Sequence, residues 1–498
     1  MPTNCQTGYG DVVGRPVEQS ELELVSLPRG SGRARAWNDA LTSELGYLCM
    51  ICVTVFLYVV IALLSLAPDG TIGKLSPIHE TVQRNTYLAE LLDVTGINHA
   101  SQLQLVAVSI VVLALLLATY AWAVLIFRRR QDKGLLSILT LTFFLCLLLV
   151  VIPPLVSKDV FSNIFYGKIA ARYHDNPYVL TPQRFAGDQL MVYVSLNWKN
   201  TAIVYGPVHT YFSMLLNLVA GEGITANIIV FKGAMAVFHF ANILLVWFIL
   251  GLIAPRRQRF GTMLYAWNPI ALTIGVGGGH NDVMMMTLVL LAVYLLLKEK
   301  RWAGFVCLCL SVLVKYISVI LVVALVIHLV SAQKGRAERL RALALYAAVF
   351  LLIFVLFFLP FWAGPGTFDS TLRNLQLNNY DSLGGWLSAL FTFIFQYVLR
   401  IPASVAQTLG SVLSKLLLLP VFLAALWFAP RRMRALRDVP DCFFWVTLAY
   451  LVTTSYYMPW YFLWLLPFIS LRPWDRASQW SLAVGTATIP LGTDIHPF

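Results

Sequence analysis

Ionisable residues of this sequence stand at short breaks between long apolar runs. The first break carries Asp159, which follows the prolines Pro153 and Pro154. Because proline cannot continue a helix, the pair predicts a helix end that delivers the carboxylate just outside an apolar segment. A carboxylate beside apolar and aromatic groups gains proton affinity and can act as a general base. The alternative is an interfacial charge paired with Lys158 or Lys168.

The second break is a glycine-rich turn, 277–282, which ends in His280, Asn281 and Asp282. Its glycines let a ligand approach the backbone closely, and imidazole, amide and carboxylate are presented together. The alternative is a tight turn in which Asn281 or Asp282 caps the next helix. His280 and Asp282 are also potential metal ligands, but without a clear third ligand the turn predicts no metal site.

Lys315 stands between two further apolar runs. At that place its ammonium could bind a lipid phosphate as a point charge. The alternative is an interfacial lysine whose side chain snorkels to the membrane surface. The aromatic segment 456–461 could stack on a sugar ring or form an ordinary interfacial belt. All these breaks are predicted at one face of the membrane, whereas a transporter tends to place its polar groups at the midplane.

Membrane-spanning helices must position these residues. Hydrophobic residues make up 59% of the 498 and charged residues 12%, against about 25% charged residues in a soluble domain. Runs such as 45–67, 103–127 and 343–362 are long enough for a bilayer core of about 30 Å. β-Barrels show short alternating segments instead. We predict an all-α polytopic integral membrane protein with roughly 12 to 14 transmembrane helices.

The net charge of +12 comes largely from short basic clusters between the apolar runs. Such clusters mark cytosolic loops, so no nucleic-acid partner is predicted. Residues 1–40 are polar and predict a flexible cytosolic tail without a cleavable signal peptide, followed by a single transmembrane domain over 41–498. Segment 157–202 is the predicted external catalytic loop, with a surface helix over 160–173, and 363–382 is a second external loop.

Three features of the apolar runs stay open. If 204–220 and 228–252 both crossed, the arginines at 256–257 would lie outside, so one run is re-entrant or the positive-inside rule is locally broken. Segment 383–399 is predicted as a partial insertion or a surface helix. Lys232 and His239 are interpreted as able to pair across helices and are given no functional role.

In chain order, these segments resemble the polyprenyl-phosphate-mannose-dependent mannosyltransferases of the GT-C superfamily. The resemblance covers about residues 135–470. The matching segments are Asp159 after the third helix, Tyr166-Gly167, Asn176-Pro177-Tyr178, Tyr205-Gly206-Pro207, Trp267-Asn268-Pro269, the turn ending at Asp282, Lys315, and Met458-Pro459-Trp460-Tyr461.

The resemblance implies a single displacement in which Asp159 deprotonates the acceptor hydroxyl while the carrier phosphate leaves, with inversion at the anomeric carbon. Basic groups would neutralise that phosphate, and the candidates are Lys315, Lys168 and Arg172. The substrate-binding candidates are Tyr166, Asn176, Tyr178, Tyr205, His280, Asn281, Asp282, Tyr457, Trp460 and Tyr461. Some relatives hold a metal with two acids spaced Asp-x-Asp. Here Val160 and Phe161 follow the aspartate, so no cofactor is expected, although a divalent metal is left open.

The predicted function is transfer of a hexose, mannose on the resemblance, from a polyprenyl-phosphate donor to a lipid- or glycan-linked acceptor of the cell envelope. The site is expected at the extracytoplasmic face of the plasma membrane, and the partners are that donor, the acceptor and membrane lipid. A second hypothesis is a transporter or flippase for a lipid-linked saccharide. A third is a polymerase or ligase that uses a diphosphate-linked donor.

Overall fold

The structure is a computed structural model in which the described residues are 38–66, 93–96, 100–130, 132–374, 377 and 379–488. Of the predicted tail 1–40, all but 38–40 lie outside this range. Within the described residues every regular element is a helix. This confirms the prediction of an all-α polytopic membrane protein.

Five helices of the described part are long and apolar enough to cross a bilayer unaided. They are α2 (Glu44–Ser65), α5 (Gln102–Arg129), α10 (Ile224–Ile253), α15 (Arg336–Phe358) and α18 (Ala403–Arg432). The π-helical η6 (Ile270–Gly277) and α12 (Asp282–Leu297) meet at 116° and form a sixth crossing if they are counted as one broken span.

Shorter helices complete the bundle. The prediction of roughly 12 to 14 transmembrane helices included several of them, although each has too few residues to span about 30 Å alone. They are α6 (Leu135–Val151), α11 (Gln258–Ala266), α13 (Arg301–Val312), α14 (Val319–Ser331), α19 (Val439–Thr453), α20 (Phe462–Leu471) and α21 (Arg476–Ala487).

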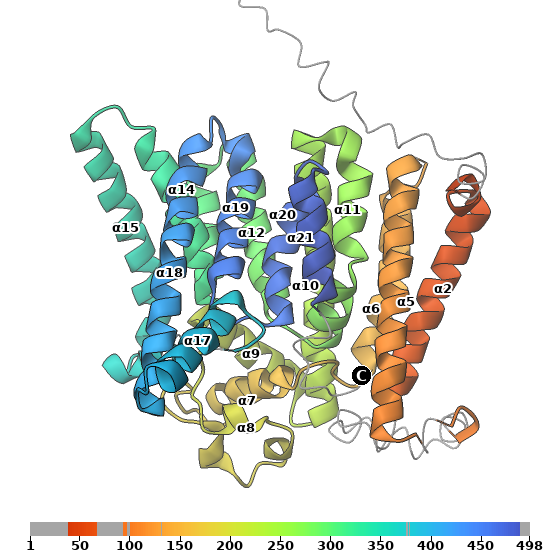
Figure 1. Ribbon diagram of the computed structural model, residues 1–498, viewed down its shortest axis with the longest axis horizontal. Helices are drawn as coiled ribbons and strands as arrows, with labels where there is room; N and C mark the ends of the chain where they lie inside the picture. Colours follow the sequence, from red (N-terminus) through yellow and green to blue (C-terminus); the bar gives the residue numbers. More distant parts are fainter. Residues whose placement is uncertain are drawn as a thin grey trace, which may run out of the picture.

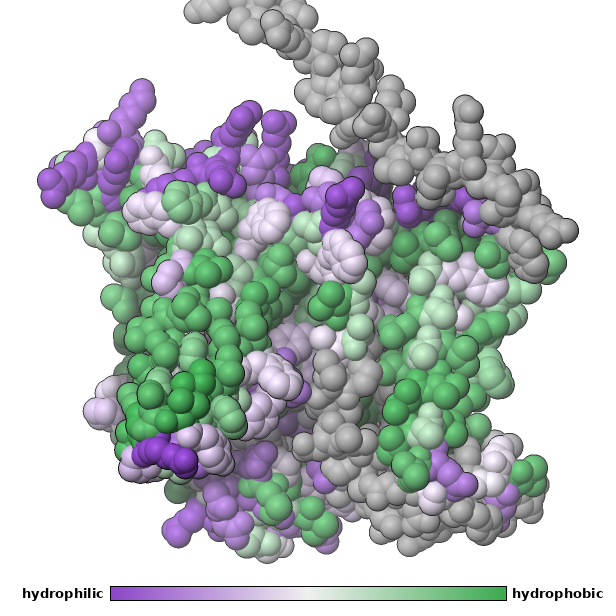
Figure 2. All heavy atoms as spheres, in the orientation of Figure 1, coloured by the Kyte–Doolittle hydropathy of each residue, from purple (hydrophilic) through white to green (hydrophobic). Residues whose placement is uncertain are grey.

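The connections that carry basic clusters gather at one end of the molecule, which we call the basic end. The links α14–α15 and α18–α19 lie there (Figure 1), and hydrophilic residues cover them above a broad apolar band (Figure 2). The opposite end, which we call the α7 end, holds α7 (Asp159–Ala171), α8 (Leu196–Lys199) and α9 (Pro207–Ala220). The charge asymmetry predicted from the sequence is therefore present in the fold.

The open question at 204–252 is resolved by the lengths of α9 and α10. α9 has 14 residues and packs against α7, whereas α10 has 30 residues, or about 45 Å at 1.5 Å per residue. Of the two, only α10 is long and apolar enough to cross a bilayer, so a single crossing would carry Arg256 and Arg257 to the basic end.

The α7 end forms a layer with its own hydrophobic core. Buried residues of α7, among them Phe161, Ile164 and Phe165, pack with Tyr178, Ile203 and neighbouring side chains in a cluster separate from that of the main bundle. Short turns of helix, η3 (Pro182–Phe185) and η4 (Gln189–Val192), complete this layer. The predicted surface helix over 160–173 is α7, and the predicted external loop is thus a folded cap.

Segment 383–399 is helical at the same end. It forms α17 (Leu383–Phe393) and the π-helical η10 (Ile394–Val398), and α17 packs against α18. Figure 1 shows α17 inclined across the lower part of α18. Both alternatives predicted a helix too short to cross a bilayer, and the segment forms such a helix.

Candidate active site

Two chain breaks meet at the junction between the bundle and the α7 layer. The first lies between α6 and α7, and the second is the glycine turn between η6 and α12. The Leu155 amide donates a hydrogen bond to the Gly277 carbonyl at 3.2 Å. Gly279 has φ +69°, and a Cβ at this position would lie 2.9 Å from Val160 Cγ2. Glycine is required for this close approach, which places Val160, the residue after Asp159, against the turn that carries His280 and Asp282.

Asp159 is the first residue of α7 and is half-buried. Its Oδ1 accepts a hydrogen bond from Trp198 Nε1 at 2.8 Å. Within the part of the chain that the structure describes, no cation forms an ion pair with it, and Lys168 pairs instead with Asp188 and Glu222. The sequence alternative of an interfacial pair with Lys158 or Lys168 is therefore not the arrangement found.

Asp282 occupies a different environment and has no exposed surface. Its Oδ1 accepts from Lys315 Nζ at 2.7 Å and also from Trp464 Nε1. His280 Nδ1 lies 3.7 Å from Oδ2. A buried carboxylate of this kind is tolerated because an ammonium and an indole satisfy it at short range.

Aromatic rings surround the ammonium of Lys315. Its Nζ lies 5.6 Å from the ring centroids of Tyr205 and Tyr461 and 5.4 Å from that of Trp464, within the range of cation–π attraction of about 6 Å. The Tyr461 and Trp464 rings stack at 4.1 Å. The predicted stacking surface and the predicted phosphate-binding lysine thus lie side by side.

Tyr205 stands between the two carboxylates. Burial raises the pKa of its hydroxyl well above the usual value, and Asp159 and Asp282 both add to the rise, so it stays a neutral donor. The adjacent Gly206 amide donates to the Val314 carbonyl at 3.2 Å, and a Cβ on Gly206 would lie 2.2 Å from the Leu313 carbonyl oxygen. This contact holds Tyr205 against the segment that ends in Lys315.

Trp460 completes the site on the side of the imidazole. Its ring lies 4.5 Å from that of His280, centroid to centroid. Asn281 is buried beside them, and its Nδ2 has no hydrogen-bond partner among the described residues. A free buried amide of this kind is available to a polar ligand.

Other predicted substrate-binding residues support the site from outside it. Tyr178 hydroxyl bonds to the Tyr205 carbonyl at 3.0 Å, and Asn176 Nδ2 donates to the Phe361 carbonyl at 2.7 Å. Tyr166 hydroxyl donates to the Thr201 carbonyl at 2.9 Å, and Tyr457 hydroxyl lies 3.1 Å from Thr488 Oγ1.

Lys168 and Arg172 lie at the far end of α7 from Asp159. Nine residues separate Lys168 from Asp159, or about 13 Å along a helix. Lys168 Nζ lies 2.7 Å from Asp188 and 3.3 Å from Glu222, and Arg172 Nε lies 3.3 Å from Glu222. Burial opposes ionisation of Asp188, but bonds from Lys168 and Tyr173 outweigh it and lower the pKa of this carboxyl. The structure does not bring these two cations to Lys315.

Trp198 and Trp464 each donate to one carboxylate of the site, and sequence reasoning missed both. Trp464 follows Trp460 at helical spacing, a signal that could have identified it. Trp198 lies in the short helix α8 of segment 157–202, and no spacing in the sequence pointed to it.

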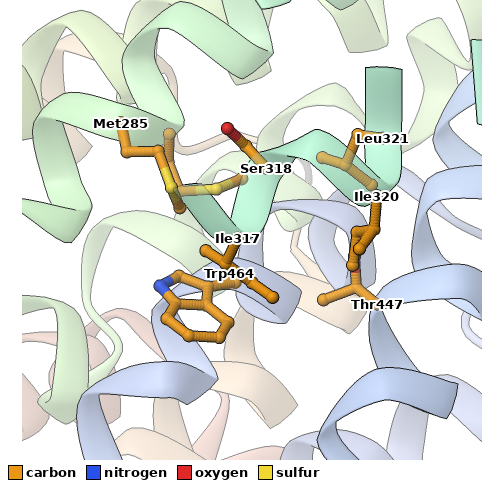
Figure 3. A pocket seen from close by; sticks show the side chains of 8 residues that line it. Met285, Ile317, Ser318, Ile320, Leu321, Thr447 and Trp464 are labelled. Atoms are coloured by element: carbon orange, nitrogen blue, oxygen red, sulfur yellow. The ribbon is translucent and has the colours of Figure 1, made fainter. Parts of the chain in front are cut away.

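The Trp464 ring also borders an apolar pocket (Figure 3). Its lining residues are Met285, Met286, Ile317, Ser318, Ile320, Leu321, Thr447 and Trp464. Within the described residues, His, Cys, Asp and Glu side chains form no group of three or more that could hold a metal ion.

A bundle of broken and short membrane helices that presents carboxylates, an ammonium and aromatic rings beneath a folded loop defines a membrane glycosyltransferase of the GT-C type. Residues 71–331 match the alpha-(1->6)-mannopyranosyltransferase N-terminal domain, and residues 204–459 match glycosyltransferase family 87. Each match covers just over half of the chain. The chain belongs to the alpha-(1->6)-mannopyranosyltransferase family, which confirms the resemblance found in its motifs.

Curated relatives carry the same description. Alpha-(1->6)-mannopyranosyltransferase A of Corynebacterium glutamicum is 29% identical over 157 residues, or 30% of this chain and 30% of that protein. Alpha-(1->6)-mannopyranosyltransferase A of Mycobacterium tuberculosis is 26% identical over 331 residues, or 63% of this chain and 61% of that protein. The alignments thus span less than two thirds of either relative.

Proposed function

We propose that this protein transfers a mannosyl residue from a polyprenyl-phosphate-linked donor to a glycan or glycolipid acceptor at the extracytoplasmic face of the plasma membrane. Family membership supports mannosyl transfer. The positive-inside rule supports the orientation, because it assigns the basic end to the cytosol and the α7 end to the outer side.

The observation that carries the proposal is the contrast between the two carboxylates. Asp282 is fully buried and bonded to Lys315 and Trp464. Asp159 is half-buried and has a single side-chain hydrogen bond from Trp198 among the described contacts. A carboxylate that is not neutralised by a cation is the one free to accept a proton.

The reaction follows as one displacement. The acceptor hydroxyl attacks the anomeric carbon of the donor and passes its proton to Asp159. The bond from that carbon to the phosphate oxygen breaks, and its electron pair leaves with the carrier phosphate. Lys315 and the neutral Tyr205 hydroxyl stabilise the departing charge, and the anomeric configuration inverts.

Substitution of Asp159 by Asn tests the proposal. The variant keeps the shape and the bond from Trp198 but cannot take the proton, so we expect transfer of radiolabelled mannose from polyprenyl-phosphate-mannose to fall by about 10²–10⁴-fold. Asp175→Asn is the matched control, because Asp175 is an exposed carboxylate just beyond α7, and it should leave the rate unchanged.

The same assay separates the other hypotheses. Purified protein that moves a lipid-linked saccharide across vesicles but transfers no sugar would replace the enzyme by a transporter. Transfer only from a diphosphate-linked donor would replace it by a polymerase or ligase.

A further inference from the structure

Lys232 is a lysine of α10 whose side chain has no exposed surface. It lies in α10 on the face that also carries His239 and Asn242, at helical spacing. His239 Nε2 lies 3.1 Å from the Ala266 carbonyl oxygen at the end of α11. The sequence suggested that Lys232 and His239 could pair across helices. Both side chains do reach neighbouring segments, and their partners there are backbone carbonyls.

The Lys232 ammonium binds the carboxyl end of α6. Its Nζ donates to the Ile152 carbonyl at 2.6 Å and lies 3.3 Å from the Pro153 carbonyl. The last carbonyls of a helix have no partner within the helix, and proline has no N–H to offer in the turn that follows. Lys232 supplies the missing donors from a neighbouring helix.

The stem of the same side chain borders the glycine turn. A Cβ on Gly279 would lie 3.4 Å from Lys232 Cγ and 2.9 Å from Val160 Cγ2. Val160 directly follows Asp159. Lys232 therefore lies where the break before Asp159 meets the break before Asp282, and α10 is the rigid helix behind both.

A buried ammonium is costly to desolvate, and methionine would fill a similar volume without that cost. Among the described residues, the acceptors of this ammonium are the Ile152 and Pro153 carbonyls. Bonds to the backbone fix a chain in space more tightly than apolar packing, because they are directional.

We propose that Lys232 is a positioning residue for the transfer reaction. Its ammonium holds the carboxyl end of α6 against α10 and thereby sets the distance between Asp159 and the turn that carries His280 and Asp282. The inference rests on the proposed function, in which Asp159 takes the acceptor proton. A displacement of about 1 Å in a reacting group can cost about 10²-fold in rate.

Kinetics of Lys232→Met and Lys232→Arg test this role in the purified full-length protein, with polyprenyl-phosphate-mannose as the donor. Lys232→Met should lower kcat by about 10²-fold and change the KM for the donor by less than about threefold, because the contacts of Lys315 are untouched. Lys232→Arg keeps the charge and the hydrogen-bond donors. Its kcat should therefore be at least about tenfold higher than that of Lys232→Met.

Gly233→Ala is the matched control, since a Cβ at the next position of α10 meets nothing within 4 Å, and it should keep the wild-type kcat. If Lys232→Met does not fold, as judged by its thermal unfolding and helix content, Lys232→Gln is measured in its place. A neutral substitution with wild-type kcat, or a loss that Lys232→Arg does not relieve, overturns the inference. Folded wild-type protein that transfers no mannose refutes the proposed function itself.

Discussion

At the scale of single residues, Lys315 and Asp282 form a short ion pair inside the protein. The carboxylate has no exposed surface and the ammonium is 13% exposed, and 2.7 Å separates Nζ from Oδ1. Removal of one partner of such a pair leaves a buried charge without compensation, which costs more than removal of both. Asp282 thus orients the Lys315 ammonium.

Lys315→Met should destabilise the protein strongly, by about 3–5 kcal/mol, because Asp282 remains buried without its cation. The double variant Lys315→Met with Asp282→Asn should lose less than this single variant. Thermal unfolding in detergent of the wild type, of Lys315→Met, of Asp282→Asn and of the double variant measures the difference. Purely additive losses would show that the two side chains are not coupled.

Residue-level prediction selected residues that stand at a break in an apolar run. Asp159, His280, Asp282, Lys315 and Tyr461 were all identified in this way, and they meet in the fold. Lys168 and Arg172 shared the first break in sequence, but α7 carries them away from Asp159 as a rigid rod. Distance along a helix, not proximity in sequence, decides which charges share a site.

At the scale of elements, the site is built from helices that stop early. α12, α13, α14 and α20 have 16, 12, 13 and 10 residues, or roughly 15–24 Å each. One end of each is followed or preceded by basic residues of the basic end. Asp282, Lys315 and Tyr461 lie at or next to the opposite ends of these helices.

Gly206→Ala should disrupt the contact between the start of α9 and the segment that follows α13. The new Cβ would lie 2.2 Å from the Leu313 carbonyl oxygen, and the backbone would have to shift, which moves Tyr205 away from Lys315. We expect a loss of stability of about 1–3 kcal/mol and a fall in mannosyl transfer of about tenfold or more.

Gly187→Ala serves as the comparison in the same layer, since a Cβ there meets nothing within 4 Å. The stability and the rate of mannosyl transfer are measured for both variants, by thermal unfolding and by the transfer assay. Equal stability and equal rates in the two variants would contradict the docking role of Gly206.

Element-level prediction identified the helices but not which of them cross. Hydropathy detects an apolar run such as 204–220 without showing whether it spans, because burial in protein and burial in lipid demand the same composition. α9 is short and packs on α7, a fact of tertiary structure. The folded cap formed by 157–202 was likewise beyond sequence reasoning, since its contacts join distant segments.

At the scale of the whole molecule, charge is distributed between two ends. The links α14–α15 and α18–α19 carry arginine and lysine at the basic end, whereas the α7 end holds the mixed pairs of Lys168 and Arg172 with Asp188 and Glu222. Retention of basic loops on the cytosolic side predicts one orientation for the entire bundle.

Cysteine labelling in whole cells tests this orientation. Asp175→Cys, exposed beyond α7, should react with a membrane-impermeant thiol reagent, while Lys334→Cys, exposed in the α14–α15 link, should react only after the cells are permeabilised. The unsubstituted protein gives the background from its own cysteines. The reverse pattern would place the site on the cytosolic side.

The long helix α15 has a further consequence. Only 6% of its most apolar window is buried within the protein, against 39% for α10. Side chains on its outer face, such as Leu343, Leu351 and Val355, are exposed at the surface of the protein, whereas Tyr346, Phe350 and Ile353 pack on the bundle. Exchanges among leucine, isoleucine, valine and phenylalanine at those exposed positions should therefore change the stability little, because acyl chains have no fixed shape. The buried positions of α10 face protein neighbours instead, and there the same exchanges should be felt.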